Sequence, residues 1–198
     1  EKIKNYNPPP RTYASVIESF GFEMRYTDGL LREPHHKAPQ YSEQQYQAQR
    51  DLPDSTWIRV GVSAGKNYNQ YGVNASFNGV MKKTTRLPPP QYRYQNVPDS
   101  LYGLELYAPP GINQQTGIAW RNHPDAQDMY VYKNSNGEVT TIIECRNRKV
   151  KRQTCAQRFN IDSSMKVSIR VRFMRNHLAD WQKIQREATK AVEIENKI

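Results

Sequence analysis

The clearest hydrophobic pattern lies in the last third of the chain. Residues 128–133 and 138–145 are two stretches rich in β-branched and aromatic side chains. Between them, Asn136 and Gly137 supply the positive φ values that a tight turn needs. The pattern predicts a β-hairpin.

Two further strand signals follow this hairpin. A second reversal over residues 146–153 returns the chain through residues 155–159, and residues 166–173 then alternate between apolar and polar side chains. Alternation of this kind is typical of a strand with one buried face. The apolar set is Val167, Ile169, Val171 and Phe173, and the polar set is Lys166, Ser168, Arg170 and Arg172.

From about His177 the period of the apolar residues becomes helical. They recur at a spacing of three or four and are Leu178, Trp181, Ile184, Ala188 and Val192. A half-buried antiparallel sheet needs a cover for its apolar face, and this helix supplies one. The predicted fold class is therefore α+β, an antiparallel β-sheet with a C-terminal amphipathic helix packed on one face.

The first two thirds of the chain carry weaker signals. Residues 42–50 have the N-cap and composition of a short helix. Residues 86–99 hold a proline triplet and predict a long extended loop. Strands are predicted at residues 19–27, 56–62, 71–83, 101–107 and 118–121, with 71–83 as the partner of 56–62.

Chain length and proline placement predict the domain organisation. Residues 1–11 contain a proline triplet and read as an extended N-terminal arm. Residues 12–198 suit a single α+β domain. Two lobes hinged near residues 84–100 are the alternative arrangement.

Composition indicates a folded protein. Thirteen Tyr, five Phe and three Trp are far more aromatic residues than disordered chains carry. No run of residues approaches the ~18 apolar positions of a membrane-spanning helix.

The two cysteines, Cys145 and Cys155, flank the second reversal. Paired strands on either side of that reversal would place them opposite each other. A disulfide there would stabilise the fold by up to about 3 kcal/mol and would indicate a compartment outside the reducing cytosol. Two unrelated buried thiols are the alternative, whereas the spacing does not suit a metal site.

The net charge of +10 is concentrated in one segment. Residues 146–175 hold ten Lys or Arg against one acidic residue, Asp162, which predicts an acidic partner surface. A solvated face that keeps a sheet edge from pairing is the alternative. The candidate contact residues are Arg148, Lys149, Lys151, Arg152, Lys166, Arg170 and Arg172.

Three tyrosines in and after the proline-rich loop are further candidates, namely Tyr92, Tyr94 and Tyr102. Tyr and Arg dominate protein interfaces, because they bury a large area and keep hydrogen bonds. The alternative is that half or more of the tyrosines belong to the core.

Motifs for catalysis are missing from the sequence. It has neither a Gly-x-Ser-x-Gly elbow nor a His-Glu-x-x-His pair, and its four histidines form no evident ligand set. We therefore expect no enzyme, no cofactor and no metal. Nucleic acid is not favoured as a partner either, since RNA-binding, helix-turn-helix and zinc-finger motifs are missing, although the basic segment keeps nucleic acid or anionic lipid as an alternative.

The last third also resembles a known family. The two-cysteine hairpin, the strand at 167–173 and the Leu178, Trp181 and Ile184 helix are together similar to the C-terminal part of periplasmic immunity proteins. These proteins accompany type VI secretion effectors, particularly antibacterial phospholipases. The resemblance covers roughly residues 128–195.

The resemblance implies a function. It implies an exported periplasmic protein or lipoprotein, without catalytic activity, that binds a cognate effector toxin and blocks its active site or lid. The signal or lipid-anchored segment would precede Glu1. The partner would be a toxin with an acidic contact surface, and an envelope adaptor or structural binding protein is the alternative.

Overall fold

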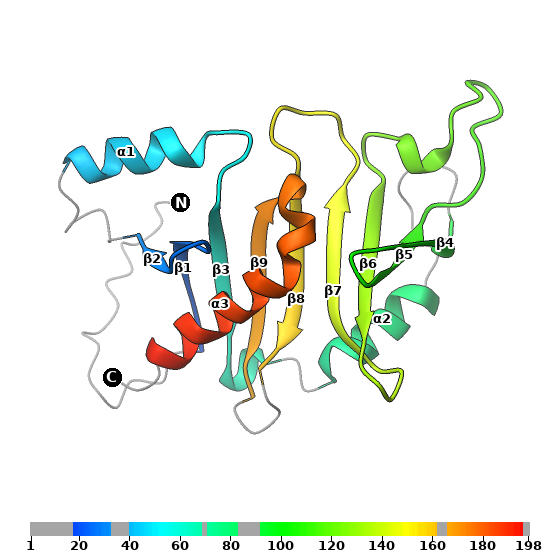
Figure 1. The fold of residues 1–198 in the computed structure, drawn as a ribbon. Coiled ribbons are helices and arrows are strands. Elements are labelled where there is room, and N and C mark those ends of the chain that lie inside the picture. The colour runs from blue at the N-terminus through cyan, green and yellow to red at the C-terminus, as the bar shows by residue number, and fades with distance from the viewer. Residues whose placement is uncertain (1–17, 33–39, 69–70, 83–91, 162–165, 196–198) are drawn as a thin grey trace, which may run out of the picture.

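The computed structural model describes residues 18–32, 40–68, 71–82, 92–161 and 166–195. The predicted N-terminal arm at 1–11 and the part of the predicted hinge before residue 92 lie outside these ranges. The described residues form a nine-stranded antiparallel sheet in the order β2-β1-β3-β9-β8-β7-β6-β5-β4 (Figure 1).

The strands and helices have the following bounds. The strands are β1 Ser19–Arg25, β2 Leu30–Leu31, β3 Trp57–Ser63, β4 Gln95–Leu101, β5 Leu104–Ala108, β6 Gln127–Lys133, β7 Val139–Arg146, β8 Thr154–Asn160 and β9 Ser168–Met174. The helices are α1 Gln40–Arg50, α2 Gly72–Lys82 and α3 Trp181–Glu195, and the short 3-10 turns are η1 Gly65–Asn67, η2 Trp120–Asn122 and η3 Arg175–Asp180.

Helix α3 crosses one face of the sheet and covers its apolar side, as Figure 1 shows. Trp181, Ile184 and Ala188 are buried there, in one core cluster with Val60 of β3 and Val171 of β9. The alternation in β9 sends every second side chain into this core, and the helical spacing in α3 supplies the facing stripe. The predicted fold class is confirmed.

A polar contact fixes how α3 sits on the sheet. The Gln185 side-chain oxygen of α3 accepts hydrogen bonds from the Thr141 hydroxyl at 2.9 Å and from the Gln157 amide at 2.8 Å. Thr141 and Gln157 are both buried in the sheet. Buried polar groups are costly unless they are paired. This contact therefore favours the observed position of α3 over positions shifted along the sheet, in which these groups would lose their partners.

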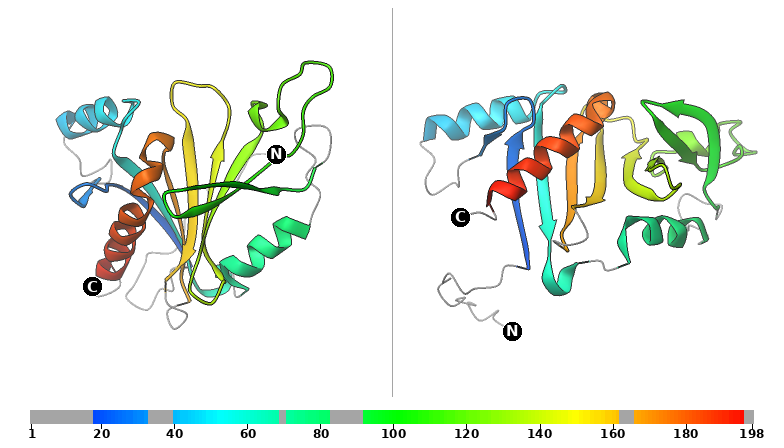
Figure 2. Two further views of the ribbon diagram at one scale, coloured as in Figure 1. Left: turned by 45° about the vertical axis from the view of Figure 1, so that its right-hand side comes forward. Right: turned by 60° about the horizontal axis from the view of Figure 1, so that its bottom comes forward.

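The opposite face of the sheet carries α2, and here the sequence prediction was wrong. Residues 71–83 were expected to form a strand beside 56–62, but Gly72–Lys82 is a helix and β3 pairs with β1 and β9. Val73, Phe77 and Val80 recur at helical spacing and pack on the outer sides of β5, β6 and β7. Figure 2 shows α2 and α3 on opposite sides of the sheet.

Three smaller expectations also needed correction. The strand expected at 118–121 is instead the 3-10 turn η2, preceded by an isolated bridge between Ile112 and Ala119. The extended loop expected at 86–99 gives way to β4 from Gln95, which pairs with β5. Helix α1 begins at Gln40, two residues before the predicted N-cap.

The predicted disulfide is confirmed. Cys145 of β7 and Cys155 of β8 lie directly opposite each other, with 4.2 Å between their Cα atoms, and both are buried beneath α3. The bond ties together the two strands whose connecting loop carries four of the ten basic residues of the segment 146–175.

Reduction of this disulfide should lower the free energy of unfolding by about 3 kcal/mol, because the released loop regains chain entropy in the unfolded state. The measurement is urea denaturation with and without a reductant. The Cys145→Ser, Cys155→Ser variant should match the reduced protein and should not respond to the reductant. Equal stability of the oxidised and reduced proteins would contradict the expectation.

Candidate partner-binding surface

Four arginines form a strip on the open, outer face of the sheet. They are Arg59 of β3, Arg170 and Arg172 of β9, and Arg158 of β8, and together they are called the arginine strip below. Arg59 pairs in register with Arg172, and Arg170 with Arg158. Because the residues between them along each strand point toward α3, these four side chains share the other face.

Two of the four arginines are neutralised and two are not. Arg59 donates to one carboxylate oxygen of Glu23 on β1, at 3.0 Å from Nε and 2.8 Å from Nη2. Arg158 donates to Glu144 of β7 at 2.5 Å. Within the described part of the chain, Arg170 and Arg172 form no ion pair. The centre of the strip therefore holds two uncompensated positive charges on adjacent outward positions of one strand.

The nearby positive charges affect the pKa of Arg170. Partial burial lowers the pKa of its guanidinium, and the nearby charges of Arg158 and Arg172 lower it further, while Glu144 offsets part of the effect. Like charges opposite each other across a sheet are destabilising. A bound anion would relieve that repulsion, so the arrangement is suited to an acidic group supplied by a partner.

Hollows lie at both ends of the strip. A groove of about 370 Å³ between α2 and the sheet has Arg158 and Arg170 in its wall, together with Asn160 and Ser168. A pocket of about 230 Å³ beside α1 is lined by residues that include Arg59 and Arg172. A partner that docks on the strip can thus reach a concave feature on either side.

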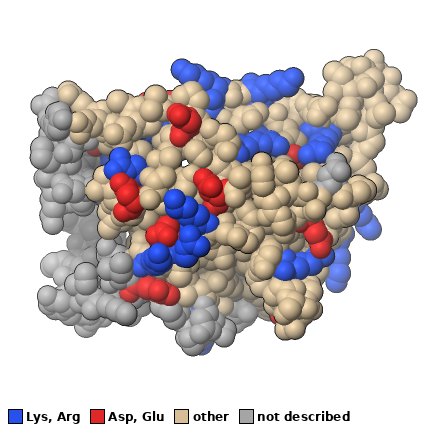
Figure 3. All heavy atoms as spheres, viewed as in Figure 1, with Lys and Arg blue, Asp and Glu red and all other residues tan. Residues whose placement is uncertain are grey.

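The predicted basic residues of the second reversal lie at one end of the sheet. Arg148, Lys149 and Lys151 are exposed in the loop between β7 and β8. Figure 3 shows Lys and Arg side chains at the upper edge of the molecule, where this loop lies, whereas those over α3 are interspersed with Asp and Glu. Arg152 is partly engaged, because it donates to Asp51 at 2.9 Å and to the Arg50 carbonyl at 2.7 Å.

Lys166 lies away from this loop. It is exposed just before β9, at the end of the sheet opposite to the loop between β7 and β8. Of the predicted basic residues, the structure places Arg170 and Arg172 at the centre of the open face and separates Lys166 from the others.

The three predicted tyrosines do not join the strip. Tyr92 is only 8% exposed, and its ring meets that of Tyr94 edge to face at 5.5 Å. Tyr94 packs against the core cluster beneath α2, where burial first and its contact with Tyr92 second raise its pKa. Tyr92 is therefore buried and Tyr94 partly buried, so most of the Tyr92 ring packs inside the protein; the assignment of the two tyrosines to a partner surface stays a prediction.

Tyr102 is exposed but faces another way. It occupies the turn between β4 and β5 with a positive φ of 55° and is 51% exposed. Its carbonyl accepts a hydrogen bond from the Trp181 indole of α3 at 3.0 Å, so it lies on the α3 side of the sheet. A partner seated on the arginine strip would not contact it.

Sequence reasoning did not assign Arg59 and Arg158 to the site. Both stand at outward positions of alternating strands, and that signal is present in the sequence. What the sequence did not reveal is that β3 and β9, more than a hundred residues apart, are neighbours. Without this pairing Arg59 cannot be placed beside Arg172.

The described residues do not show a metal centre. They contain no group of three or more His, Cys, Asp or Glu side chains that could hold a metal ion. The His123 ring accepts a hydrogen bond from the Asp125 backbone, and the His177 ring contacts the Asp54 carbonyl at 3.0 Å. None of the helices in the described part has the length and apolar character that a membrane crossing requires.

Comparison with known proteins adds one structural likeness. No protein-family model matches the sequence, and no curated protein matches it. The fold is similar to the solved structure of an immunity protein of the Stenotrophomonas maltophilia type IV secretion system, with a TM-score of 0.55 and 14% sequence identity. The match covers 89% of this chain and 81% of the other. At this identity the likeness establishes a shared fold.

Proposed function

We propose that this protein is an immunity protein that binds a cognate secreted antibacterial toxin and neutralises it. The observation that carries the proposal is the fold, which is similar over 89% of the chain to an immunity protein of a bacterial secretion system. The resemblance of the last third to periplasmic immunity proteins supports the same class from the sequence. The protein would act by binding alone, without catalysis.

The arginine strip gives this function a contact surface. Arg170 and Arg172 present uncompensated charge on an open sheet face, and an acidic toxin surface would neutralise them. Complementary charge across an interface mainly accelerates and orients association. Docking of the strip next to a toxin's active site or lid would exclude the toxin's substrate.

The disulfide supports a location outside the cytosol. Disulfides persist in the periplasm and are rare where thiols are kept reduced. We therefore propose that the protein works in the periplasm, where it would meet toxins delivered from neighbouring cells.

The secretion system that delivers the toxin has two candidates. The sequence resemblance points to a type VI lipase effector, whereas the structural neighbour belongs to a type IV system. We retain the type VI lipase effector as the finer proposal. The toxin's own sequence tests the finer proposal, because a lipase of the α/β-hydrolase class carries a Gly-x-Ser-x-Gly nucleophile elbow.

Nucleic acid is the alternative partner for a basic face. Glu23 and Glu144 stand among the arginines of the strip and interrupt the continuous positive track that a phosphate backbone follows. An acidic protein surface, whose own charges alternate, suits this pattern better. Retention on heparin well above physiological salt would shift the assignment to a nucleic-acid or polyanion binder.

Co-purification tests the proposal. The tagged protein is co-expressed with the product of its neighbouring gene, and the complex is measured by light scattering and calorimetry. A stoichiometric complex with nanomolar or tighter affinity is the expected result. Absence of a complex between two well-folded proteins would overturn the immunity function.

A further inference from the structure

The pocket beside α1 has a composition unlike that of the other hollows. It lies where α1 meets the ends of β3, β8 and β9 and has a volume of about 230 Å³. Four arginines line it with a single carboxylate residue, and three aromatic and two further apolar residues complete most of its wall. The lining residues include Arg50, Arg59, Arg152, Arg172, Glu23, Tyr46, Trp57 and Met174. It is called the α1 pocket below.

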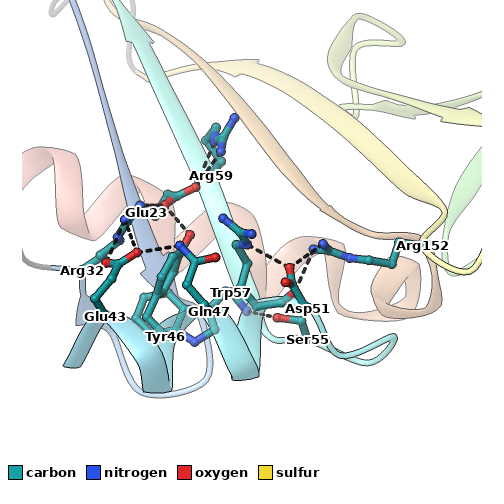
Figure 4. Close-up of polar contacts among 11 residues, drawn as sticks. Glu23, Arg32, Glu43, Tyr46, Gln47, Asp51, Ser55, Trp57, Arg59 and Arg152 are labelled. Carbon is teal, nitrogen blue, oxygen red and sulfur yellow. Dashed lines mark hydrogen bonds and ion pairs between the residues drawn. The ribbon is translucent and has the colours of Figure 1, made fainter. Parts of the chain in front are cut away.

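The one carboxylate in the α1 pocket is already saturated. Glu23 accepts hydrogen bonds from the Tyr46 hydroxyl, from Arg32 at 2.6 Å and from Arg59 at 2.8 Å (Figure 4). Burial alone would raise the pKa of this carboxyl, but the hydrogen bonds from Tyr46, Arg59 and Arg32 bring it below its usual value. Glu23 therefore remains ionised and has no capacity left for Arg172.

Asp51, which directly follows α1, also accepts hydrogen bonds from arginines. It accepts from Arg50 at 3.1 Å. It also accepts from Arg152 at 2.9 Å, as Figure 4 shows. Arg152 also donates from Nη2 to the Arg50 carbonyl. These contacts fix the guanidinium of Arg152 at the wall of the pocket.

Two donors at the pocket have no acceptor among the described residues. The Nε atom of Arg152 is buried and forms no hydrogen bond, although both terminal nitrogens of the same guanidinium are engaged. Arg172 forms no ion pair within the described ranges. A buried donor without an acceptor is costly, and native proteins rarely retain one unless a further group completes it.

The remaining walls are rigid and largely aromatic. The Tyr46 and Trp57 rings meet edge to face at 5.0 Å, and the Trp57 indole donates to Gln49 at 3.1 Å. Such walls suit the short aliphatic stem of an acidic side chain. The volume is below the roughly 300–1,000 Å³ of sites that hold drug-sized ligands, so the pocket is sized for a small group.

From these features we propose that the α1 pocket receives the carboxylate of one Asp or Glu side chain from the protein partner. The carboxylate would accept from the exposed guanidinium of Arg172, beside the fixed guanidinium of Arg152, and the stem would lie against Trp57. This proposal rests on the proposed function for the identity of the partner. The pocket would then supply one specific anchor beside the broader attraction of the strip.

A phosphate is the competing occupant, because arginine forks bind both anions. Glu23 and Asp51 bring two fixed negative charges close to the pocket. They cancel part of the positive charge of the four arginines, and this lessens the electrostatic advantage of a doubly charged phosphate over a singly charged carboxylate.

The test uses the whole protein and a hexaglutamate peptide as the probe. Nitrogen-15 NMR follows the arginine Nε–H signals during titration. Saturable shifts of Arg152 and Arg172 are expected at the same peptide concentration. The Arg172→Gln variant should bind the peptide about tenfold more weakly, since hydrogen bonds to charged groups contribute an effect of that order.

Arg186→Gln is the matched control, because Arg186 is an exposed arginine on α3 that lines the hollow on the other face of the sheet. It should leave the peptide affinity unchanged. Arg172→Lys keeps the charge without the fork and should give an intermediate affinity. Thermal unfolding of each variant establishes that it is folded.

Peptide affinity that is the same in wild type and Arg172→Gln would overturn the proposal. Inorganic phosphate that binds more tightly than the peptide would also overturn it, as would a single-stranded oligonucleotide that does so. The titration needs no toxin, so its failure counts against the pocket alone. Failure to co-purify with the neighbouring gene product counts against the immunity function alone.

Discussion

Replacing both Arg170 and Arg172 by Glu should slow association with the toxin by about tenfold to a hundredfold at low ionic strength. The two side chains are the uncompensated charges of the arginine strip, and their reversal would turn attraction of an acidic surface into repulsion. Dissociation should change less than association. Stopped-flow or surface-based kinetics at several salt concentrations measure the effect, and the decrease of the association rate with rising salt, which attraction produces, should be lost.

A matched charge reversal separates steering from net charge. Arg186→Glu with Lys190→Glu changes the net charge by the same amount, but these residues belong to α3 on the other face of the sheet. Association of this control should stay within a few-fold of wild type. If both double variants slow association equally, the net charge of the protein is responsible and the partner surface lies elsewhere.

Replacing Asp128 by Asn should lower the free energy of unfolding by about 3–5 kcal/mol. Asp128 is 1% exposed at the start of β6 and binds two guanidiniums, with Arg121 at 2.8 Å and Arg175 at 2.8 Å. Asn147 also donates to it at 3.2 Å. Loss of the carboxylate charge would leave two partly buried cations without their common partner. Urea denaturation of the two proteins measures the difference.

The same residue gives a pH dependence with a definite sign. Burial alone would raise the pKa of Asp128, but hydrogen bonds from Arg121 and Asn147 and the charges of Arg121 and Arg175 lower it below the usual value. A lowered folded-state pKa stabilises the protein above the unfolded pKa, and this stability is lost as the pH falls through the folded pKa. The Asp128→Asn variant should therefore lose less stability than wild type below about pH 4.

Two results would contradict this account of Asp128. One is a variant within about 1 kcal/mol of wild type at neutral pH, which would mean that the arginines find other partners. The other is a parallel acid transition in both proteins. Asp180→Asn is the control. Asp180 is an exposed carboxylate just before α3, and the amide oxygen of Asn can still accept the hydrogen bond from the Tyr26 hydroxyl.

The sequence predicted the elements whose signals are local. The hairpin of β6 and β7, the alternation in β9 and the stripe of α3 each follow from residues close together in the chain, and all were confirmed. The disulfide was predicted for the same reason, because Cys145 and Cys155 flank one short reversal. Side-chain periodicity is sufficient where a strand or helix buries one face.

Prediction failed where pairing is long-range or where two periods compete. A turn and a strand precede α2 in the sequence and favour a second strand there, but Val73, Phe77 and Val80 recur at helical spacing and form a helix. The pairing of β3 with β9 cannot be predicted from residues close together in the sequence. The sequence therefore predicts only part of the candidate site. The alternation in β9 indicates Arg170 and Arg172, whereas Arg59 and the α1 pocket depend on contacts between distant segments.

The pairing of β3 with β9 has a consequence for the order of folding. Strands β6 to β9 are joined by short connections and can form as a meander. Strand β3 lies between β1 and β9, so its pairing with β9 cannot form until the last of the described strands is in place. Contacts of such long sequence separation form slowly, because loop-closure entropy is lost before they contribute. Arg59 and Arg172 stand on the two sides of this junction, so the surface proposed to capture the toxin is completed late in folding. Binding of a partner at this surface would thus require that β3 has already paired with β9.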